Sequence, residues 1–415
     1  MSSQQRIAIV GGGPAGLTLA LLLHKHGIPA TIFELRQKPT EEEFAKPSGM
    51  LDLHEGSGID AIKECGLFDD FIPLTGDCAE ATIVADKHGS ILYERNSERL
   101  SRPEISRNAL NKLLIGNLPP GAIKWGHKLL SATCTTTGGH TETELDFGPH
   151  GKQTFDLVVG ADGAWSRVRK LIAGEKPYYA GRQIITLTIT HITEKYPHLA
   201  ELVGPGSFMA LGGRNGVVSQ RGPVDSARIY IFLSLAPEGS SSSTTSSGLA
   251  GQTPGAARDK LLESDALLGT WGAPIKELVA AGCEEEAARD PAAKLDIRAM
   301  YTQSVGSSWD HRPGVTLIGD AAHLMLPSGE GVNLGMLDAL LLSRAIVEAS
   351  LEATAGDGDV ATSFRDTFDP LLKAFEVDLG ARAKTAAEHS QWLSKVMFEE
   401  DGATALAMAF QGWVN

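Results

Sequence analysis

The stretch Ile7-Ala8-Ile9-Val10-Gly11-Gly12-Gly13-Pro14-Ala15-Gly16 decides the fold of the N-terminal region. Its four leading apolar residues predict a short, buried parallel strand. The Gly-x-Gly-x-x-Gly pattern after them permits a tight turn and lets the backbone approach a pyrophosphate at the N-terminus of a helix. A helix expected from Ala15 to His26 and a strand from Ala30 to Phe33 complete a βαβ unit. The stretch therefore predicts a Rossmann-like, dinucleotide-binding domain.

An acidic residue supports this interpretation. Glu34 closes the second predicted strand, 23 residues after Gly11, and a carboxylate there can accept hydrogen bonds from ribose hydroxyls. An ordinary glycine-rich turn is the structural alternative. The pattern by itself does not choose between NAD and FAD.

Two later segments also combine a buried strand with a glycine-containing turn. In the first, Asp156 to Gly160 leads to Asp162-Gly163, and the following Ser166 and Arg169 suggest a helix cap and a surface charge when taken alone. In the second, Val315 to Ile318 leads to Gly319-Asp320. The residues after it are Pro327, Gly329, Gly331 and Asn333 before a predicted apolar helix. A glycine-rich loop in front of a core helix is the alternative for this last segment.

Composition excludes several classes of function. The chain has 415 residues, 42% of them hydrophobic, and a formal net charge of −14. A nucleic-acid-binding protein usually carries a basic surface, and no Lys/Arg-rich block occurs here. The four cysteines form no metal-ligand spacing, no signal region is evident, and no apolar stretch of about 18 residues would span a bilayer. We therefore expect a cytoplasmic protein with reduced cysteines, no bound metal, no nucleic-acid partner and no membrane span.

Changes of pattern along the chain predict an α/β fold with two domains. A Rossmann-like FAD-binding domain is expected over residues 1–175 and 295–360, with excursions into the second domain near 80–105. An inserted antiparallel-sheet, substrate-binding domain is expected over 176–294, because apolar residues alternate from 183 to 235. Its Ser-rich stretch within 238–256 predicts a flexible loop. Residues 361–415 predict a C-terminal helical segment.

The three glycine-containing motifs, at these spacings, resemble those of class A, single-component FAD-dependent monooxygenases, relatives of para-hydroxybenzoate hydroxylase. The segments 49–58 (Gly-Met-Leu-Asp-Leu-His-Glu-Gly-Ser-Gly), 103–108 (Pro-Glu-Ile-Ser-Arg-Asn) and 319–325 (Gly-Asp-Ala-Ala-His-Leu-Met) are similar to those of the tetracycline-inactivating subgroup. The resemblance runs from Arg6 to about Ile346 and is weak over 176–300.

The resemblance implies roles for individual residues. FAD contacts are expected at Gly11, Gly13, Ala15, Gly16, Glu34, Arg36, Asp52, Arg107, Asp162, Gly163, Asp320, Pro327, Gly331 and Asn333. The family places an arginine for the nicotinamide cofactor where this chain has Ala45, so Lys46 is the substitute candidate for NADPH. In the Pro327-Ser328-Gly329-Glu330 turn, one residue rather than two separates proline from glycine, and glutamate replaces the usual glutamine.

The resemblance also implies a reaction. NADPH or NADH would reduce the flavin, and O2 would add to give a C4a-hydroperoxide that hydroxylates an aromatic or polycyclic small molecule, with a role in secondary metabolism. Substrate contacts are expected from Phe208, Met209, Tyr230 and Phe232, although alternating apolar residues also form plain cores. Leu187 and Ser207 fall where the tetracycline-inactivating members have glutamine and arginine, which favours another substrate. His323 is a candidate proton donor, with a structural role as the commoner alternative.

Two other functions fit parts of the pattern. One is an FAD-dependent oxidase or epoxidase of the same fold. The other is a non-catalytic binding protein related to GDP-dissociation inhibitors, which share the first motif but lack the Asp162-Gly163 and Gly319-Asp320 segments. Whichever function holds, we expect the protein to be a monomer.

Overall fold

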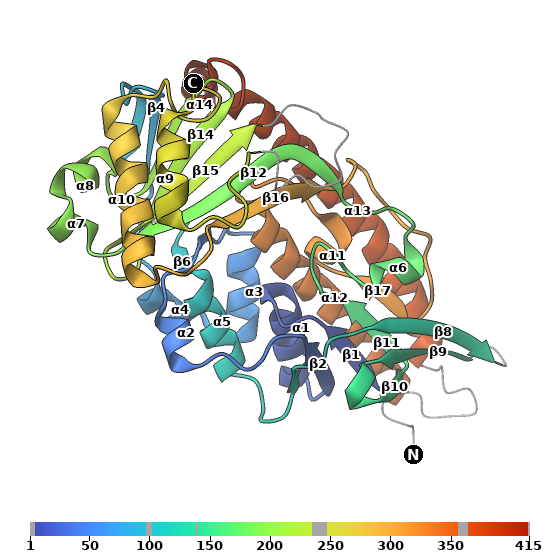
Figure 1. Ribbon diagram of the computed structural model, residues 1–415. Helices are drawn as coiled ribbons and strands as arrows, with labels where there is room; N and C mark the ends of the chain where they lie inside the picture. The colour runs from blue at the N-terminus through green and yellow to red at the C-terminus, as the bar shows by residue number, and fades with distance from the viewer. Residues whose placement is uncertain (1–4, 97–101, 138–139, 235–246, 356–363, 414–415) are drawn as a thin grey trace.

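A parallel sheet forms the centre of the N-terminal region. The computed structural model describes residues 5–96, 102–137, 140–234, 247–355 and 364–413 (Figure 1). The strand order of this sheet is β17 (Val315–Leu317), β11 (Leu157–Gly160), β1 (Ile7–Val10), β2 (Ala30–Glu34) and β7 (Ile123–Trp125). All of its pairings are parallel, with Ile9 of β1 opposite Val159 and Ile32. The strands β17, β11, β1 and most of β2 are apolar and buried, as the sequence predicts for a doubly covered parallel sheet, whereas the edge strand β7 is partly exposed.

Helices pack around this sheet and carry the motif residues. The helix α1 (Pro14–Lys25) packs against α12 (Glu330–Ala355), and α12 also contacts α3 (Gly58–Cys65). A small two-stranded sheet, β3 (Met50–Asp52) with β6 (Glu104–Ser106), precedes α5 (Arg107–Gly116). The three-stranded sheet of β8 (Ser131–Thr137), β9 (His140–Asp146) and β10 (Lys152–Phe155) lies beside β11 of the parallel sheet. The α/β Rossmann-like class is thus confirmed.

A seven-stranded sheet forms the second region. Its order is β16 (Asp296–Thr302), β12 (Tyr178–Ile189), β15 (Ser226–Ser234), β14 (Asn215–Gly222), β13 (Ser207–Gly212), β4 (Ala81–Asp86) and β5 (Ile91–Asn96). The pairings are antiparallel except that of β13 with β4. The expected excursion near 80–105 thus supplies two strands. The boundary expected at 295 is wrong by one strand, because β16 pairs with β12 and not with the parallel sheet.

The two faces of the seven-stranded sheet have different coverings. The helices α9 (Pro254–Glu263) and α10 (Ala273–Arg289) lie on one face (Figure 1), where fully buried side chains such as Ile185, Leu187 and Ile229 form a core. On the other face, α14 (Gly402–Trp413) packs against β4, β5 and β13. The rest of that face turns toward the parallel-sheet region.

The C-terminal residues are helical, as predicted. The 34-residue helix α13 (Phe364–Met397) packs along α12 and leads to α14. The remaining elements are short: α2 (Glu41–Ala45), α4 (Phe68–Phe71), α6 (Arg169–Ile172), α7 (Ile192–Lys195), α8 (Pro197–Val203), α11 (Asp320–His323), η1 (Ile72–Leu74) and η2 (Gly148–His150). Residues 238–246 of the expected flexible loop lie outside the described residues. In its last part, Thr253 caps α9.

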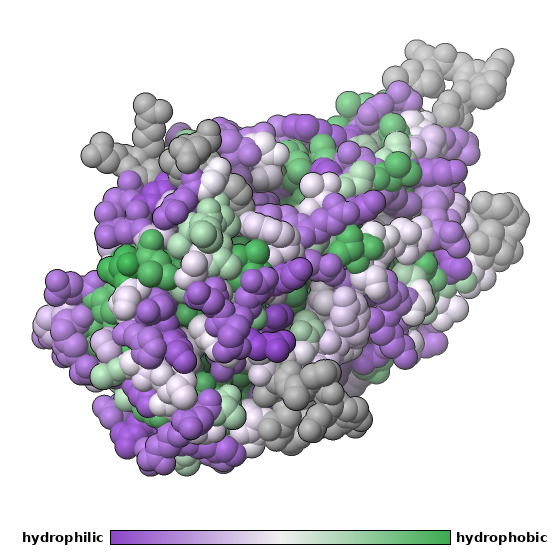
Figure 2. All heavy atoms as spheres, turned by 90° about the horizontal axis from the view of Figure 1, so that it is seen from above, coloured by the Kyte–Doolittle hydropathy of each residue, from purple (hydrophilic) through white to green (hydrophobic). Residues whose placement is uncertain are grey.

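The surface near the C-terminus is mostly hydrophilic, with separate hydrophobic groups between the polar ones (Figure 2). Within the described ranges, no helix is both long and apolar enough to cross a membrane. The same residues contain no cluster of three or more His, Cys, Asp or Glu side chains placed to hold a metal ion.

Candidate cofactor and substrate site

The three motifs meet at the carboxyl edge of the parallel sheet. Gly11 follows β1, Asp162 follows β11, and Gly319 follows β17, and these strands are neighbours. Backbone hydrogen bonds continue past the strand ends, from Ala161 N–H to the Val10 carbonyl at 2.7 Å and from Ile318 N–H to the Gly160 carbonyl at 2.9 Å. Ligands of open α/β sheets bind at this edge. The arrangement therefore brings residues separated by some 300 positions into one site.

Two glycines of the first motif are required by the protein's own packing. A Cβ on Gly11 would lie 2.1 Å from the Ala161 carbonyl oxygen, and the Gly11 φ of +114° disfavours any side chain. A Cβ on Gly16 would lie 2.2 Å from the Gly11 carbonyl oxygen. Their absence of side chains lets the first two motifs lie in contact.

Three other glycines, one in each motif, are suited to a bound ligand. Gly13, Gly163 and Gly331 are half-buried, yet no atom of the described chain lies within 4 Å of a Cβ built on any of them. Gly13 precedes α1 and Gly331 is in the first turn of α12, so both offer backbone N–H groups at a helix N-terminus. This combination fits the pyrophosphate and ring of FAD.

Ala15 and Gly319 show how closely the first and third motifs approach. A Cβ on Gly319, whose φ is +59°, would lie 3.3 Å from the Ala15 Cβ. The Ala15 Cβ is equally near the corresponding position on Gly335 of α12. Small residues therefore allow α1 to lie against the loop after β17.

The carboxylate of Glu34 organises the loop next to these glycines. Glu34 is buried, and its oxygens accept hydrogen bonds from Gly12 N–H at 2.7 Å and Arg36 N–H at 2.9 Å. The Arg36 side chain is exposed. The carboxylate keeps lone pairs for a further donor, such as a ribose hydroxyl.

Asp162 has a mainly local role. One of its carboxylate oxygens accepts the Arg167 N–H at 2.7 Å, which closes the turn after β11. The other oxygen is buried and has no hydrogen-bond partner among the described residues. Burial raises the pKa of this carboxyl group. An additional donor from a ligand would offset that cost.

Arg169 is not the surface charge that its segment suggests. It is buried and donates hydrogen bonds to the carbonyls of Ala321 at 2.9 Å and Asp320 at 3.3 Å, and to Ala164 of its own turn. Burial lowers the pKa of its guanidinium group. Arg169 thus ties the second motif to the third, a role that only the tertiary contact reveals.

A network of ionic side chains from α12 and α13 supports the third motif. Asp338 of α12 accepts hydrogen bonds from Gly319 N–H at 3.0 Å and Arg382 of α13 at 2.9 Å, and it lies 2.6 Å from His323 Nε2. Burial opposes a charge on His323, but Asp338 raises its pKa overall. The contact with Asp338 favours the structural role of His323, and the sequence did not predict this partner or the pairing of Asp338 with Arg382. A lone aspartate in an otherwise apolar helical stretch was the available signal.

Asp320 and Pro327 are exposed at the same edge, with Asp320 in the first turn of α11. Arg169 donates to the Asp320 carbonyl and so fixes the backbone of this exposed residue. This placement is compatible with the FAD contacts expected of both residues.

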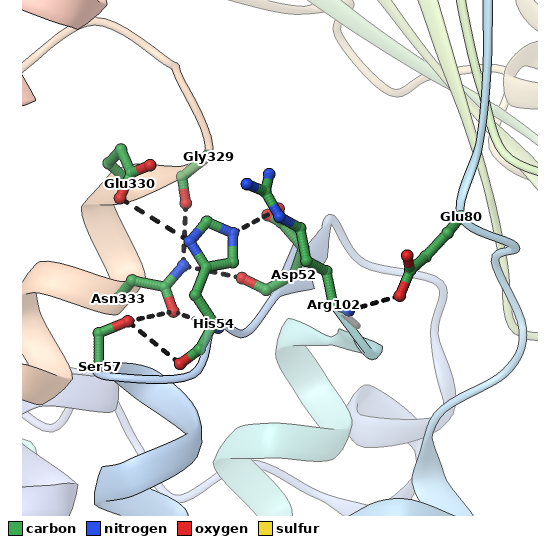
Figure 3. A network of polar contacts seen from close by, with 8 residues as sticks. All are labelled: Asp52, His54, Ser57, Glu80, Arg102, Gly329, Glu330 and Asn333. Carbon is green, nitrogen blue, oxygen red and sulfur yellow. Dashed lines mark hydrogen bonds and ion pairs between the residues drawn. The ribbon is translucent and has the colours of Figure 1, made fainter. Parts of the chain in front are cut away.

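Asn333 joins the third motif to the Asp52 segment (Figure 3). It is buried, donates to the carbonyls of Asp52 at 2.8 Å and Gly329 at 3.2 Å, and accepts the His54 N–H at 2.9 Å. The His54 ring lies between two carboxylates, with Nε2 2.8 Å from Asp52 and Nδ1 3.9 Å from Glu330. The Asn333 side chain therefore links the two segments, and both its amide N–H group and its carbonyl oxygen already have protein partners.

Arg107 and Lys46 lie beside this segment. Arg107 N–H donates to the Gly49 carbonyl at 2.9 Å, and the Arg107 side chain is exposed. Lys46 ends α2 and is also exposed, 4.0 Å from Glu42. Lys46 thus lies shortly before β3, which ends at Asp52, and Arg107 directly follows β6, the strand that pairs with β3.

The four expected substrate contacts divide between two locations. Phe208 is fully buried in the core beneath α9 and α10, and Met209 packs against the α14 side, so both belong to packing, contrary to expectation. Tyr230 and Phe232 lie on the face toward the third motif. Phe232 packs with Met300, Leu326 and Phe398, and the Tyr230 hydroxyl lies against Gly49. The structure therefore brings these two, and not the other two, to the candidate site.

Comparison with known proteins agrees with this geometry. Residues 4–265 and 275–362 match the family model described as FAD binding domain. The chain is 34% identical to Monooxygenase penA of Penicillium thymicola, over 97% of both proteins. Its fold resembles Klebsiella pneumoniae HpxO complexed with FAD and uric acid, with a TM-score of 0.72, 17% identity, and coverage of 99% of this chain and 93% of that one. It also resembles the tetracycline destructase Tet(55), with a TM-score of 0.66, 16% identity, and coverage of 100% and 95%.

These findings define the class and then the family. The protein is an FAD-dependent monooxygenase of class A. The chain belongs to the FAD binding domain family. The alternative of a non-catalytic, GDP-dissociation-inhibitor-like protein is therefore wrong.

Proposed function

We propose that this monooxygenase uses NADPH or NADH to hydroxylate an aromatic or polycyclic small molecule, in secondary metabolism. The observation that carries the proposal is the cluster of Phe232, Met300, Leu326 and Phe398. It joins the seven-stranded sheet to the residue just before Pro327 of the third motif. These four side chains are each less than a tenth exposed, and they would form the apolar wall against which a flat ring packs, since aromatic side chains bury large areas.

The residues at the carboxyl edge would hold FAD. Backbone groups of Gly13 and Gly331 would contact the pyrophosphate and the ring, and Glu34 would accept from the adenosine ribose. The exposed Asp320 and Arg107 would contribute further polar contacts. Once bound, FAD would accept a hydride from the nicotinamide cofactor and activate O2 for transfer of one oxygen atom.

The chain's own residues would orient the substrate and exclude water. Tyr230 presents a half-buried hydroxyl beside Gly49, whereas Phe232 contributes an apolar ring. His54, held by Asp52 and Asn333, is placed to hold a proton at Nε2 on the Asp52 side. Excluding water protects a reactive oxygenating site from wasteful side reactions.

An absorption spectrum and one pair of variants test the cofactor site. We expect the purified protein to show flavin absorption and Asp320→Ala to retain less FAD. Asp310→Ala is the matched control, because Asp310 is an exposed loop residue outside the motifs. Equal FAD affinity in wild type and Asp320→Ala would remove Asp320 from the site.

Anaerobic titration tests the reaction. We expect NADPH or NADH to bleach the flavin, faster when a suitable aromatic compound is present. Aerobic turnover should then add one oxygen atom to that compound, as measured by mass spectrometry. Formation of hydrogen peroxide with an unoxygenated product would indicate an oxidase, and an epoxide product would indicate the epoxidase alternative.

A further inference from the structure

A cleft at one end of the seven-stranded sheet gathers positive charge. It is lined by the cationic side chains of Lys46, Arg228, Arg289 and Lys294 and the carboxylates of Glu286 and Asp296, with room of about 270 Å³. The cleft thus has an excess of two positive charges in a chain of net charge −14. The local excess of positive charge attracts anions. The acidic remainder of the protein repels them, so the cleft is the favoured place for an anion to bind.

The guanidinium groups of this cleft are held in place by the sheet. Arg228 donates to Thr188 Oγ1 at 3.1 Å and to the Pro47 carbonyl at 3.3 Å, and its Nε is buried with no partner among the described residues. Arg289, at the end of α10, donates to the Thr188 carbonyl at 3.3 Å. A planar guanidinium fixed by such contacts keeps its remaining N–H groups for an anion.

The acidic residues of the cleft are already engaged. Glu286 accepts from Arg289 at 3.0 Å, and Asp296 pairs with the neighbouring Arg298 at 3.1 Å. Arg298 also donates to Thr186 Oγ1 at 3.3 Å, on the same strand as Thr188. The carboxylates therefore position arginines, and the excess of two positive charges remains after both carboxylates are counted.

The cleft is connected to the candidate cofactor site by two strands. From Pro47 the chain runs through β3 to Asp52, a length of six residues or roughly 20 Å at most. From Arg228, β15 runs to Tyr230 and Phe232 on the same face. An extended dinucleotide with its phosphates in the cleft could direct its other end toward Asp52.

We propose that this cleft binds the phosphate groups of the reduced nicotinamide dinucleotide, with Arg228 and Arg289 as the main contacts and Lys46 and Lys294 at the rim. The inference rests on the proposed function, since it names the site of the reductant. It assigns the phosphate recognition to residues of the seven-stranded sheet and α10.

Calorimetric titration of the oxidised holoenzyme tests the cleft directly. The probes are NADP⁺ and adenosine 2′,5′-bisphosphate, and the variants are Arg289→Gln and Arg228→Gln. We expect each variant to bind both probes about tenfold more weakly or worse, because a charge-assisted contact is lost, with unchanged FAD content. Arg258→Gln is the matched control, because this arginine of α9 pairs with Asp259 and Glu284 and does not line the cleft.

The outcomes separate this inference from the proposed function. Unchanged affinity in Arg289→Gln, an exposed residue whose loss does not threaten folding, would overturn the cleft as the phosphate site even if NADPH still reduces the flavin. Failure of wild-type enzyme to be reduced by either dinucleotide would overturn the proposed function. The bisphosphate titration would still decide whether the cleft binds phosphate groups.

Discussion

The edge of the parallel sheet and the open face of the seven-stranded sheet make their sites in different ways. At the parallel edge, glycines and backbone N–H groups dominate, and Gly11 and Gly16 have no space for a side chain. On the seven-stranded sheet, side chains form the sites: Arg228 lines the cleft, and the buried Phe232 belongs to the apolar cluster that faces the third motif. A backbone site restricts its sequence strongly, whereas a side-chain site can change with the ligand. The first is therefore visible in a single sequence and the second is not.

The largest effect is expected where buried charge supports the backbone site. Asp338→Ala removes the carboxylate shared by His323, Arg382 and Gly319 N–H. We expect the free energy of unfolding to fall by about 3–5 kcal/mol, because the buried His323 loses its partner and the half-buried Arg382 keeps only Asp378. Urea denaturation measures this. A loss below about 1 kcal/mol would show that the third motif does not depend on the Asp338 carboxylate.

The second-largest effect is expected at the glycine-rich carboxyl edge of the parallel sheet. Gly11→Ala should impose about 3 kcal/mol of strain, because its Cβ would meet the Ala161 carbonyl. FAD binding should then weaken about a hundredfold, as measured by flavin absorption at increasing FAD concentration. Gly380→Ala in α13, where a Cβ meets nothing, is the control and should retain FAD. Normal FAD binding by Gly11→Ala would break the claim that this edge is built from backbone.

The next prediction concerns Glu104 of β6, whose burial should make the free energy of unfolding depend on pH. Burial raises its pKa from 4.5 to about 7, so the native state favours the protonated form. Its contribution to stability is full below about pH 4.5 and is lost as the pH rises through 7. We expect Glu104→Gln to remove about 2 kcal/mol of the decline in unfolding free energy between pH 5 and 8. The exposed Glu94→Gln should keep the wild-type profile, and an equally steep profile in Glu104→Gln would contradict the assignment.

The smallest effects should distinguish the two faces of the seven-stranded sheet. Phe208→Leu should cost about 1–2 kcal/mol of stability with an unchanged KM for the organic substrate, because Phe208 lies in the helix-covered core. Phe232→Leu should raise that KM severalfold at similar kcat, since it trims the face toward the third motif. Steady-state kinetics and thermal unfolding measure both. The reverse result would exchange the roles assigned to the faces.

Much of the fold was predictable because its patterns are local. Apolar runs next to glycines located β1, β11 and β17, and alternation located the strands of the second sheet. The division of Phe208 from Tyr230 was not predictable, because both lie in alternating apolar stretches. Their faces depend on which elements cover the sheet. The place of β16 was likewise decided by pairing with β12 and not by its own residues.

The sequence by itself determined the dinucleotide fold, the FAD class and the three motif positions, since tight turns and close backbone approach require glycine at defined spacings. Tertiary structure decided what the polar and charged residues near those motifs do. Arg169 is buried and joins the second motif to the third, Asn333 joins the third motif to the Asp52 segment, and His323 pairs with Asp338, which also accepts from Arg382. These roles arise from contacts between residues far apart in the chain. Local sequence patterns do not predict these roles, because burial and charge pairing are properties of the folded chain.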